Sequence, residues 1–236
     1  MAELAGSFVL GIETSGPRSA VALTREDRLL IETARLGTSH NEVLLEMVDE
    51  LLARTGRSLD ELSAIGVTAG PGMFTALRVG LATAVGLALP RGLPVKSVGT
   101  LTAIAETCSP ARRVLTLVDA RRGQVYFGFY DNGQALIEPR LADPAEVAAA
   151  LPALVGTPAV MAGSGVESCR ESFAGFDVID TGIRSPSALA VAVLAGRELA
   201  RTGPDKPEAV VPRYLRRTDA ELNRDATVDS DRPAGS

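Results

Sequence analysis

The chain has one histidine, two cysteines and no tryptophan among its 236 residues. With His40 as the only imidazole, no HxxxH or HExxH metal site can be built within one chain. A Ser-His-Asp triad would need the same histidine, and no G-x-S-x-G elbow accompanies it. Cys108 and Cys169 match no CxxC or disulfide pattern, which indicates a reducing compartment. The sequence therefore predicts no metal site and no catalytic residue, and it favours His40 as a helix-capping or surface residue.

Excess positive charge and long apolar runs are also missing. A net charge of -5 argues against a broad basic surface for nucleic acid, so any contact with RNA is expected to be local or supplied by a partner. Residues 73–89 are mostly apolar but are interrupted by Arg78 and two glycines, whereas a membrane span needs about 20 apolar residues. The first 15 residues lack the basic and apolar regions of a signal peptide. We therefore expect a cytoplasmic protein without a membrane segment.

A pattern of three short strands and two turns occurs twice in the chain. The six β-rich runs cover residues 8–12, 19–23, 29–34, 114–118, 124–130 and 135–137. Between the last two lies Asp131-Asn132-Gly133, which is a strong hairpin signal. Each set of strands is followed by alternating helices and strands. The sequence predicts an α/β fold with two lobes of related ββα-type topology and mixed sheets.

The expected helices and further strands divide between these lobes. After the first meander they cover residues 41–54, 64–68, 74–89 and 95–98, and after the second they cover residues 144–151, 160–162 and 187–200. The hydrophobic fraction of 46% is sufficient for one large domain or two lobes. We predict an N-terminal lobe at 1–105, a C-terminal lobe at 106–217 and a disordered, polar tail at 218–236.

Two helices of the first half carry more apolar surface than one lobe needs. In the helix at 41–54, apolar residues span an arc of about 200°, about twice the width that covers a core. The helix at 74–89 has Arg78 as its only charge, and a row of small residues would let another backbone approach closely. Burial of that helix in its own lobe is an alternative of roughly equal weight. The predicted partner-binding residues are His40, Leu44, Leu45, Val48, Met73, Phe74, Ala76, Leu77, Arg78, Gly80, Leu81 and Ala84.

Three loops could contact phosphate. The candidate residues are Glu13, Thr14 and Ser15 in one loop, Gly70 and Gly72 in a second, and Asp119 and Arg121 in a third. The glycine loop precedes a helix, so its amides could face an anion, although a tight strand-to-helix turn is favoured over this function. The two acidic loops occupy equivalent places in the meanders and would face each other across a cleft. Glu13 and Asp119 could there hold Mg²⁺, but turn formation explains them equally well.

Four motifs stand in a family-specific order: GIETS at 11–15, SHNE at 39–42, GPGMFTALRVG at 70–80 and DARRGQVY at 119–126. With them the chain resembles the TsaB (YeaZ) family over nearly its whole length, from about residue 8 to the PRYLR segment at 212–216. This family belongs to the actin/hexokinase/Hsp70-like superfamily, whose fold is ribonuclease H-like. Met73 and Ala76 stand where the family commonly has serine and glycine, and Glu13 replaces the usual aspartate.

The resemblance implies a non-catalytic scaffold subunit. Members pair with TsaD, the larger paralogue that holds a metal and transfers threonylcarbamoyl to the adenosine beside the anticodon of tRNA, and they recruit the ATPase TsaE. The same two helices commonly make a homodimer in isolation. No intrinsic cofactor is implied, but ATP or ADP with Mg²⁺ could bind at the complex interface. Of the family's glycine pattern on the adenosine side of the nucleotide, the second lobe retains only Gly163-Ser164-Gly165.

Two alternatives come from other functional classes. An independent ATP-dependent phosphotransferase would use Glu13 and Asp119 around Mg²⁺. A protease is suggested only by the older naming of the family as glycoproteases, and the residues supply neither a triad nor a metal centre.

Overall fold

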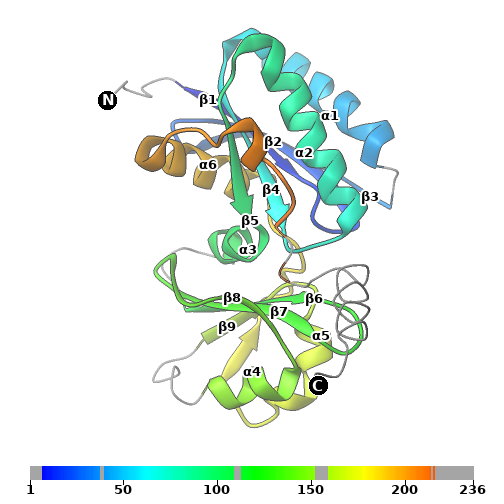
Figure 1. The fold of residues 1–236 in the computed structure, drawn as a ribbon, viewed down its shortest axis with the longest axis vertical. Coiled ribbons are helices and arrows are strands. Elements are labelled where there is room, and N and C mark those ends of the chain that lie inside the picture. Colours follow the sequence, from blue (N-terminus) through cyan, green and yellow to red (C-terminus); the bar gives the residue numbers. More distant parts are fainter. Residues whose placement is uncertain (1–6, 38–39, 109–112, 152–158, 214, 216–236) are drawn as a thin grey trace, which may run out of the picture.

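The computed structural model describes residues 7–37, 40–108, 113–151, 159–213 and 215, which form two lobes stacked one above the other (Figure 1). The polar tail predicted at 218–236 lies outside the described residues. Each lobe contains a five-stranded mixed sheet. The sequence prediction of two mixed-sheet α/β lobes is therefore confirmed.

The sheet of the first lobe has the strand order β3-β2-β1-β4-β5. Its strands are β1 (Phe8–Glu13), β2 (Arg18–Arg25), β3 (Arg28–Leu36), β4 (Leu62–Gly70) and β5 (Val95–Gly99). The first three strands pair antiparallel, and β4 and β5 continue the sheet in parallel. Every residue of β1 is buried, as expected for a central strand that is covered on both faces.

The sheet of the second lobe repeats this arrangement in the order β10-β9-β6-β7-β8. Its strands are β6 (Val114–Asp119), β7 (Val125–Asp131), β8 (Gln134–Ala142), β9 (Ala159–Ala162) and β10 (Val178–Asp180). Asn132 and Gly133 have positive φ in the turn between β7 and β8, as the hairpin signal indicates. Helices α4 (Pro144–Ala150) and α5 (Val166–Cys169) and the short helix η3 (Glu171–Phe173) accompany this sheet.

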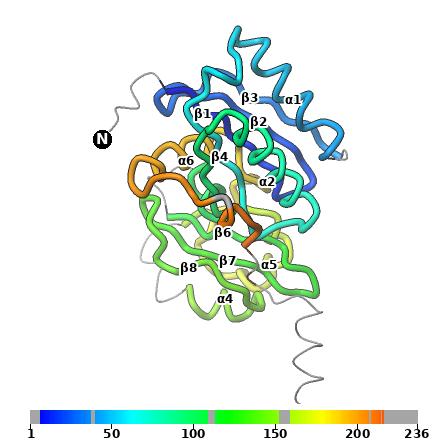
Figure 2. Tube along the Cα trace, turned by 45° about the horizontal axis from the view of Figure 1, so that its top comes forward, coloured from blue at the N-terminus to red at the C-terminus, as the bar shows by residue number. Residues whose placement is uncertain are grey.

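Helices cover both faces of the first sheet (Figures 1 and 2). Leu10 and Ile12 of β1 share one core with α1 (His40–Thr55) and α2 (Phe74–Ala88). Val9 faces the opposite side, where it packs against α6 (Ala188–Thr202). Side chains of a strand alternate between its two faces, so one strand serves both layers. Helix α3 (Thr100–Cys108) contacts strands of both sheets, and η1 (Leu59–Glu61), η2 (Leu89–Arg91) and η4 (Pro207–Ala209) are short connectors.

Helix α6 does not belong to the lobe that its sequence position suggests. The prediction that grouped residues 187–200 with the second lobe is wrong, because α6 packs on β1, β2 and β4 of the first. Glycines make this docking possible: a Cβ at Gly11 would collide with the carbonyl of Ala188, and one at Gly66 would lie 2.5 Å from the Cβ of Ala195. The chain therefore crosses to the second lobe and returns.

The segment after α6 runs along β5 and covers the edge of the first sheet. The Asp205 amide donates to the Val95 carbonyl at 3.0 Å, and the Lys96 ammonium lies 2.7 Å from the Asp205 carboxylate. Further on, the Arg213 amide donates to the Ala69 carbonyl at 2.7 Å. The Asp205 bond satisfies part of the open edge of β5, and the bond of Arg213 to β4 brings residue 213 beside the turn that leads into α2.

Candidate functional site

A cleft of about 650 Å³ lies between the two lobes. It is lined by the β1–β2 loop, the start of α2, the start of α3, the β6–β7 loop and residues 184–186. Ser15 and Asp119 both line it, so the expectation that the two hairpin loops face each other across a cleft is confirmed. The Arg18 guanidinium donates to the Pro186 carbonyl at 2.7 Å, which ties the first lobe to the segment returning from the second.

Glu13 does not line this cleft and is fully buried at the end of β1. Its Oε1 accepts hydrogen bonds from the Ser15 amide at 2.8 Å and from the Ser15 hydroxyl at 2.5 Å. Burial raises the pKa of this carboxyl to about 7, against the smaller lowering effect of these hydrogen bonds. The carboxylate pair suggested by the sequence is therefore wrong, because Asp119 lines the cleft and Glu13 does not.

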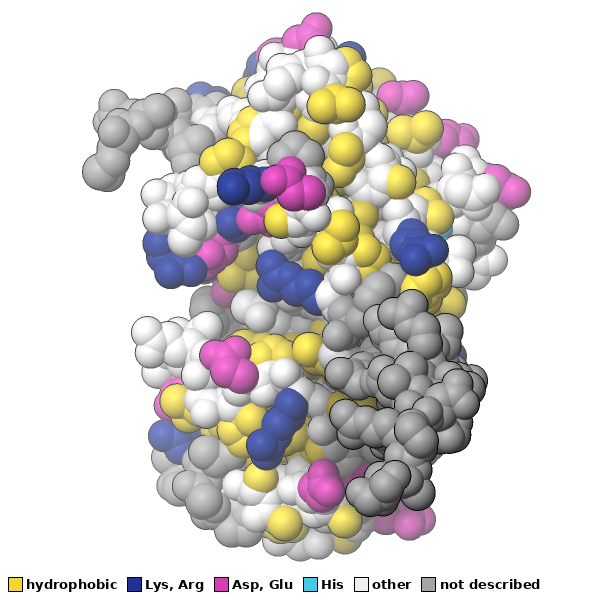
Figure 3. Space-filling model, in the orientation of Figure 1, with side chains coloured by type: hydrophobic (Ala, Val, Ile, Leu, Met, Phe, Trp, Pro, Cys, Tyr) yellow, Lys and Arg dark blue, Asp and Glu magenta, His cyan; other side chains and the backbone are white. Residues whose placement is uncertain are grey.

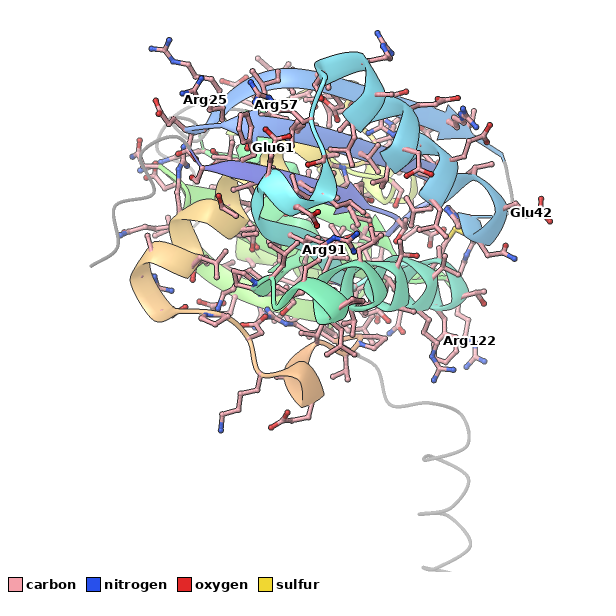
Figure 4. All side chains as sticks on the ribbon, turned by 90° about the horizontal axis from the view of Figure 1, so that it is seen from above. Arg25, Glu42, Arg57, Glu61, Arg91 and Arg122 are labelled. Atoms are coloured by element: carbon pink, nitrogen blue, oxygen red, sulfur yellow. The ribbon has the colours of Figure 1, made fainter. Side chains whose placement is uncertain are left out.

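The loop that carries Asp119 uses its carboxylate within its own turn. Oδ1 accepts from the Arg121 amide at 2.7 Å, while the Asp119 amide donates to the Ser164 hydroxyl at 3.1 Å. Arg121 and Arg122 both have positive φ, an uncommon backbone state for residues with a Cβ. Figure 4 shows Arg122 at the same end of the molecule as Glu42, where α1 and α2 begin. The Asp119 carboxylate therefore stabilises its own turn, as the alternative interpretation of this loop proposes. Arg121 lines the cleft.

The glycine loop before α2 is filled by the protein's own backbone. The Met73 amide donates to the Ser15 carbonyl at 2.8 Å, and a Cβ on Gly72 would collide with the same carbonyl. Gly70 has a φ of 112°, and Arg213 packs against it. This geometry matches a tight strand-to-helix turn, the alternative favoured over a phosphate loop. Thr14 is buried beneath Gly80 of α2.

His40 begins α1 and is half-buried. Its Nδ1 lies 2.6 Å from the Ser19 hydroxyl of β2, and burial lowers the pKa of the imidazole. The residue therefore joins the helix to the sheet, a contact that the sequence did not reveal because Ser19 is 21 positions earlier. Within the ranges that the structure describes, no group of three His, Cys, Asp or Glu side chains could hold a metal ion.

Most of the predicted partner-binding residues belong to the core of the first lobe. The buried members are Leu44, Val48, Ala76, Leu77, Gly80, Leu81 and Ala84. The row of small residues on α2 faces the sheet, where a Cβ on Gly80 would collide with the Thr14 hydroxyl. The prediction of these seven as partner contacts is therefore wrong. Periodicity finds an apolar face, but it does not distinguish a strand beneath the helix from a second protein.

Apart from the half-buried His40, the remaining predicted residues are exposed and lie mainly on α2. Leu45, Met73 and Phe74 are 51%, 44% and 44% exposed, and Arg78 is also exposed. The outer face of α2 continues with Val79, Ala82, Val85, Gly86 and Leu89, all exposed or half-buried. Figure 3 shows hydrophobic side chains along α2 and acidic ones over α1. We call residues 73, 74, 75, 78, 79, 82, 85, 86 and 89 the α2 face; apart from Arg78 and Thr75 it carries no polar side chain.

The outer side of α1 is polar by contrast. Glu46 and Glu50 both bind the Arg35 guanidinium of β3, at 2.7 and 2.8 Å. Only Leu45 interrupts this acidic surface with a large exposed apolar side chain. The wide apolar arc predicted for this helix is therefore used mainly inside the lobe, and excess apolar surface remains on α2.

Comparison with known proteins agrees with these features. Residues 35–223 match the family model described as TsaD, tRNA N6-adenosine threonylcarbamoyltransferase. The structure of YeaZ from Pseudomonas aeruginosa superposes with a TM-score of 0.78 at 29% identity, covering 89% of this chain and 100% of that one. The chain belongs to the TsaB/YeaZ family. The resemblance carried by the four motifs is thereby confirmed.

Relatives of the TsaB/YeaZ family differ in how much of the chain they match. TsaB of Escherichia coli is 34% identical over 129 residues, which are 53% of this chain and 56% of that protein. The chain thus spans about half the length of the curated TsaB relatives it matches. A ROK family glucokinase from Streptomyces griseus, 10% identical with a TM-score of 0.50 over 81% of this chain and 100% of that one, shares only the fold. The hexokinase-like fold expectation is confirmed.

None of the helices that the structure describes combines the length and apolar character required to cross a bilayer.

Proposed function

We propose that this chain is a non-catalytic subunit in tRNA threonylcarbamoyladenosine biosynthesis, that it pairs with TsaD, and that it recruits TsaE in the cytoplasm. The pathway is that of the curated relatives, which are named tRNA threonylcarbamoyladenosine biosynthesis protein TsaB. The observation that carries the pairing role is the α2 face. A helix surface with Phe74 and Leu89 exposed at 44% and 72% and no carboxylate is typical of an interface.

The geometry of the cleft supports the non-catalytic part of the proposal. Catalysis by this superfamily needs carboxylates and amides directed at a phosphate. Here the Met73 amide is bound to the Ser15 carbonyl, and Glu13 is buried and does not line the cleft. The sequence has a single histidine, so a metal held by a histidine pair would come from the partner. ATP or ADP with Mg²⁺ is proposed to bind at the interface of the complex.

Size-exclusion chromatography with light scattering tests the pairing. We expect the purified chain to co-elute with TsaD of the same organism and Phe74→Glu to lose co-elution, because burying a carboxylate in an apolar interface is costly. Leu136→Glu on β8 is the matched control, since Leu136, at 51%, is about as exposed as Phe74 but lies in the other lobe. Absence of co-elution by the unmodified chain would refute the proposal.

Self-association and nucleotide binding are tested on the isolated chain. A homodimer through the α2 face is expected without TsaD, and Phe74→Glu should convert it to a monomer. The phosphotransferase alternative requires the isolated chain to bind ATP, and calorimetry should detect none. Micromolar binding of ATP that is lost in Asp119→Asn would favour the alternative, because Asp119 is the carboxylate that lines the cleft.

A further inference from the structure

Arg78 is the one charged residue of α2, and it stands in the middle of the exposed α2 face. It forms no hydrogen bond or ion pair with any residue that the structure describes. Two of the acidic residues of α1, Glu46 and Glu50, both bind Arg35 and not Arg78. The Arg78 guanidinium therefore has its donors available on a surface that is otherwise largely apolar.

Contact with Phe74 holds this guanidinium in place. Its carbon lies 3.9 Å from the centroid of the Phe74 ring, one helical turn earlier. Such stacking attracts a cation to the face of the ring and leaves the N–H donors at the edge of the guanidinium directed outward. A side chain that is already ordered loses less conformational entropy when it binds.

An apolar partner alone would not complement this surface. Covering the α2 face would remove water from Arg78, and desolvating an arginine without an acceptor strongly disfavours binding. The planar guanidinium pairs best with a carboxylate, which accepts two parallel hydrogen bonds. The cost disappears only if the covering surface carries such a group at the matching position.

We propose that the partner surface covering α2 places a carboxylate against Arg78, so that Arg78 determines which proteins this face accepts. The inference rests on the proposed function and names the chemistry of the partner side, an Asp or Glu set in an apolar surface. The occupant is the larger paralogous subunit. A surface without the carboxylate is rejected because Arg78 stays uncompensated.

The experiment measures the dissociation constant of the full chain with that subunit by calorimetry. Variants are Arg78→Glu, Arg78→Lys and the control Arg28→Glu. Arg28 is exposed on β3, at the sheet edge opposite β5, and its side chain likewise forms no hydrogen bond or ion pair with a described residue. We expect Arg78→Glu to weaken binding at least about tenfold, Arg78→Lys to weaken it less, and Arg28→Glu to leave it unchanged. Thermal melts should show that all three variants fold.

A charge exchange identifies the carboxylate. Each Asp and Glu on the docking surface of the partner is changed to Arg and combined with Arg78→Glu; one combination should recover at least about tenfold in affinity. Equal affinities of Arg78→Glu and the unmodified chain would overturn this inference alone and leave the pairing intact. Failure of the unmodified chain to bind would overturn both. If Arg78→Glu abolishes only the homodimer seen by light scattering, the carboxylate belongs to a second copy and the commitment to the larger subunit is wrong.

Discussion

At the scale of single residues, Glu13 shows how the family's acidic position behaves in this chain. The carboxyl group is enclosed at the end of β1, and Ser15 satisfies one of its oxygens. The other oxygen has no partner among the described residues. Because burial disfavours the charged form, the folded protein holds the proton up to a pH of about 7.

The stability of the protein should therefore fall as Glu13 ionises. The pKa of Glu13 rises from 4.5 in the unfolded chain to about 7 in the folded protein, so folding binds a proton between these values. The contribution is fully present below pH 4.5, and up to about 3 kcal/mol is lost as the pH rises through 7. Urea unfolding at several pH values should show this loss relative to Glu13→Gln, which keeps the acceptor for Ser15.

The control for this comparison is Glu171→Gln, since Glu171 is exposed to solvent. It should keep the pH dependence of the unmodified protein. Parallel stability curves for the unmodified protein and Glu13→Gln between pH 4 and about 8 would contradict the role assigned to burial.

Two glycines of α2 offer a second test at this scale. Gly80 faces Thr14 so closely that a Cβ would collide with its hydroxyl, whereas nothing lies within 4 Å of a Cβ on Gly86. Gly80→Ala should destabilise the fold by about 1–3 kcal/mol through overpacking. Gly86→Ala should stabilise it by up to about 1 kcal/mol, because alanine favours the helix. Chemical denaturation of both variants checks the difference, and equal effects would mean that α2 does not rest on Thr14.

At the scale of elements, α2 has one face in the core and one face toward solvent. Leu77 is 1% exposed, and Phe74, three residues earlier, is 44% exposed. The sequence pattern treats both as apolar residues of one helix. Their different surroundings come from β4 and α1, which pack against α2 from one side only.

Truncation of these two residues should therefore have opposite consequences. Leu77→Ala should lower the free energy of unfolding by about 2–5 kcal/mol through the cavity it leaves. Phe74→Ala should cost much less stability but weaken pairing, because the ring and the stacked Arg78 leave the α2 face. Denaturation midpoints and binding to TsaD measure both effects. If Phe74→Ala unfolds the chain while Leu77→Ala does not, the orientation of α2 is wrong.

At the scale of the whole molecule, the first lobe is completed by the end of the chain. Val191, Ala192 and Ala195 of α6 share a core with Val9 of β1 and Ala64 of β4. Without α6, one face of the first sheet would expose this apolar layer to water. The two lobes are therefore not independent folding units along the sequence.

A fragment of residues 1–113 should accordingly fail to fold. It contains all strands of the first sheet but lacks α6 and the segment at 203–213. We expect a molten or aggregated product without a cooperative thermal transition and with strong binding of a hydrophobic dye. A chain of residues 1–213, which retains both segments, should melt cooperatively. A cooperative transition in the short fragment would show that α6 is dispensable.

The sequence by itself determined the two strand meanders, the apolar helices and, through four motifs, the family. These signals are local, because periodicity and turn residues report which residues are apolar and where the chain reverses. Only the tertiary structure decided what each apolar face touches. Gly80 packs against Thr14 and Leu77 lies in the core. Glu13 is buried, and α6 packs on the first sheet. Such outcomes depend on contacts between residues far apart in the chain, which a local pattern does not encode.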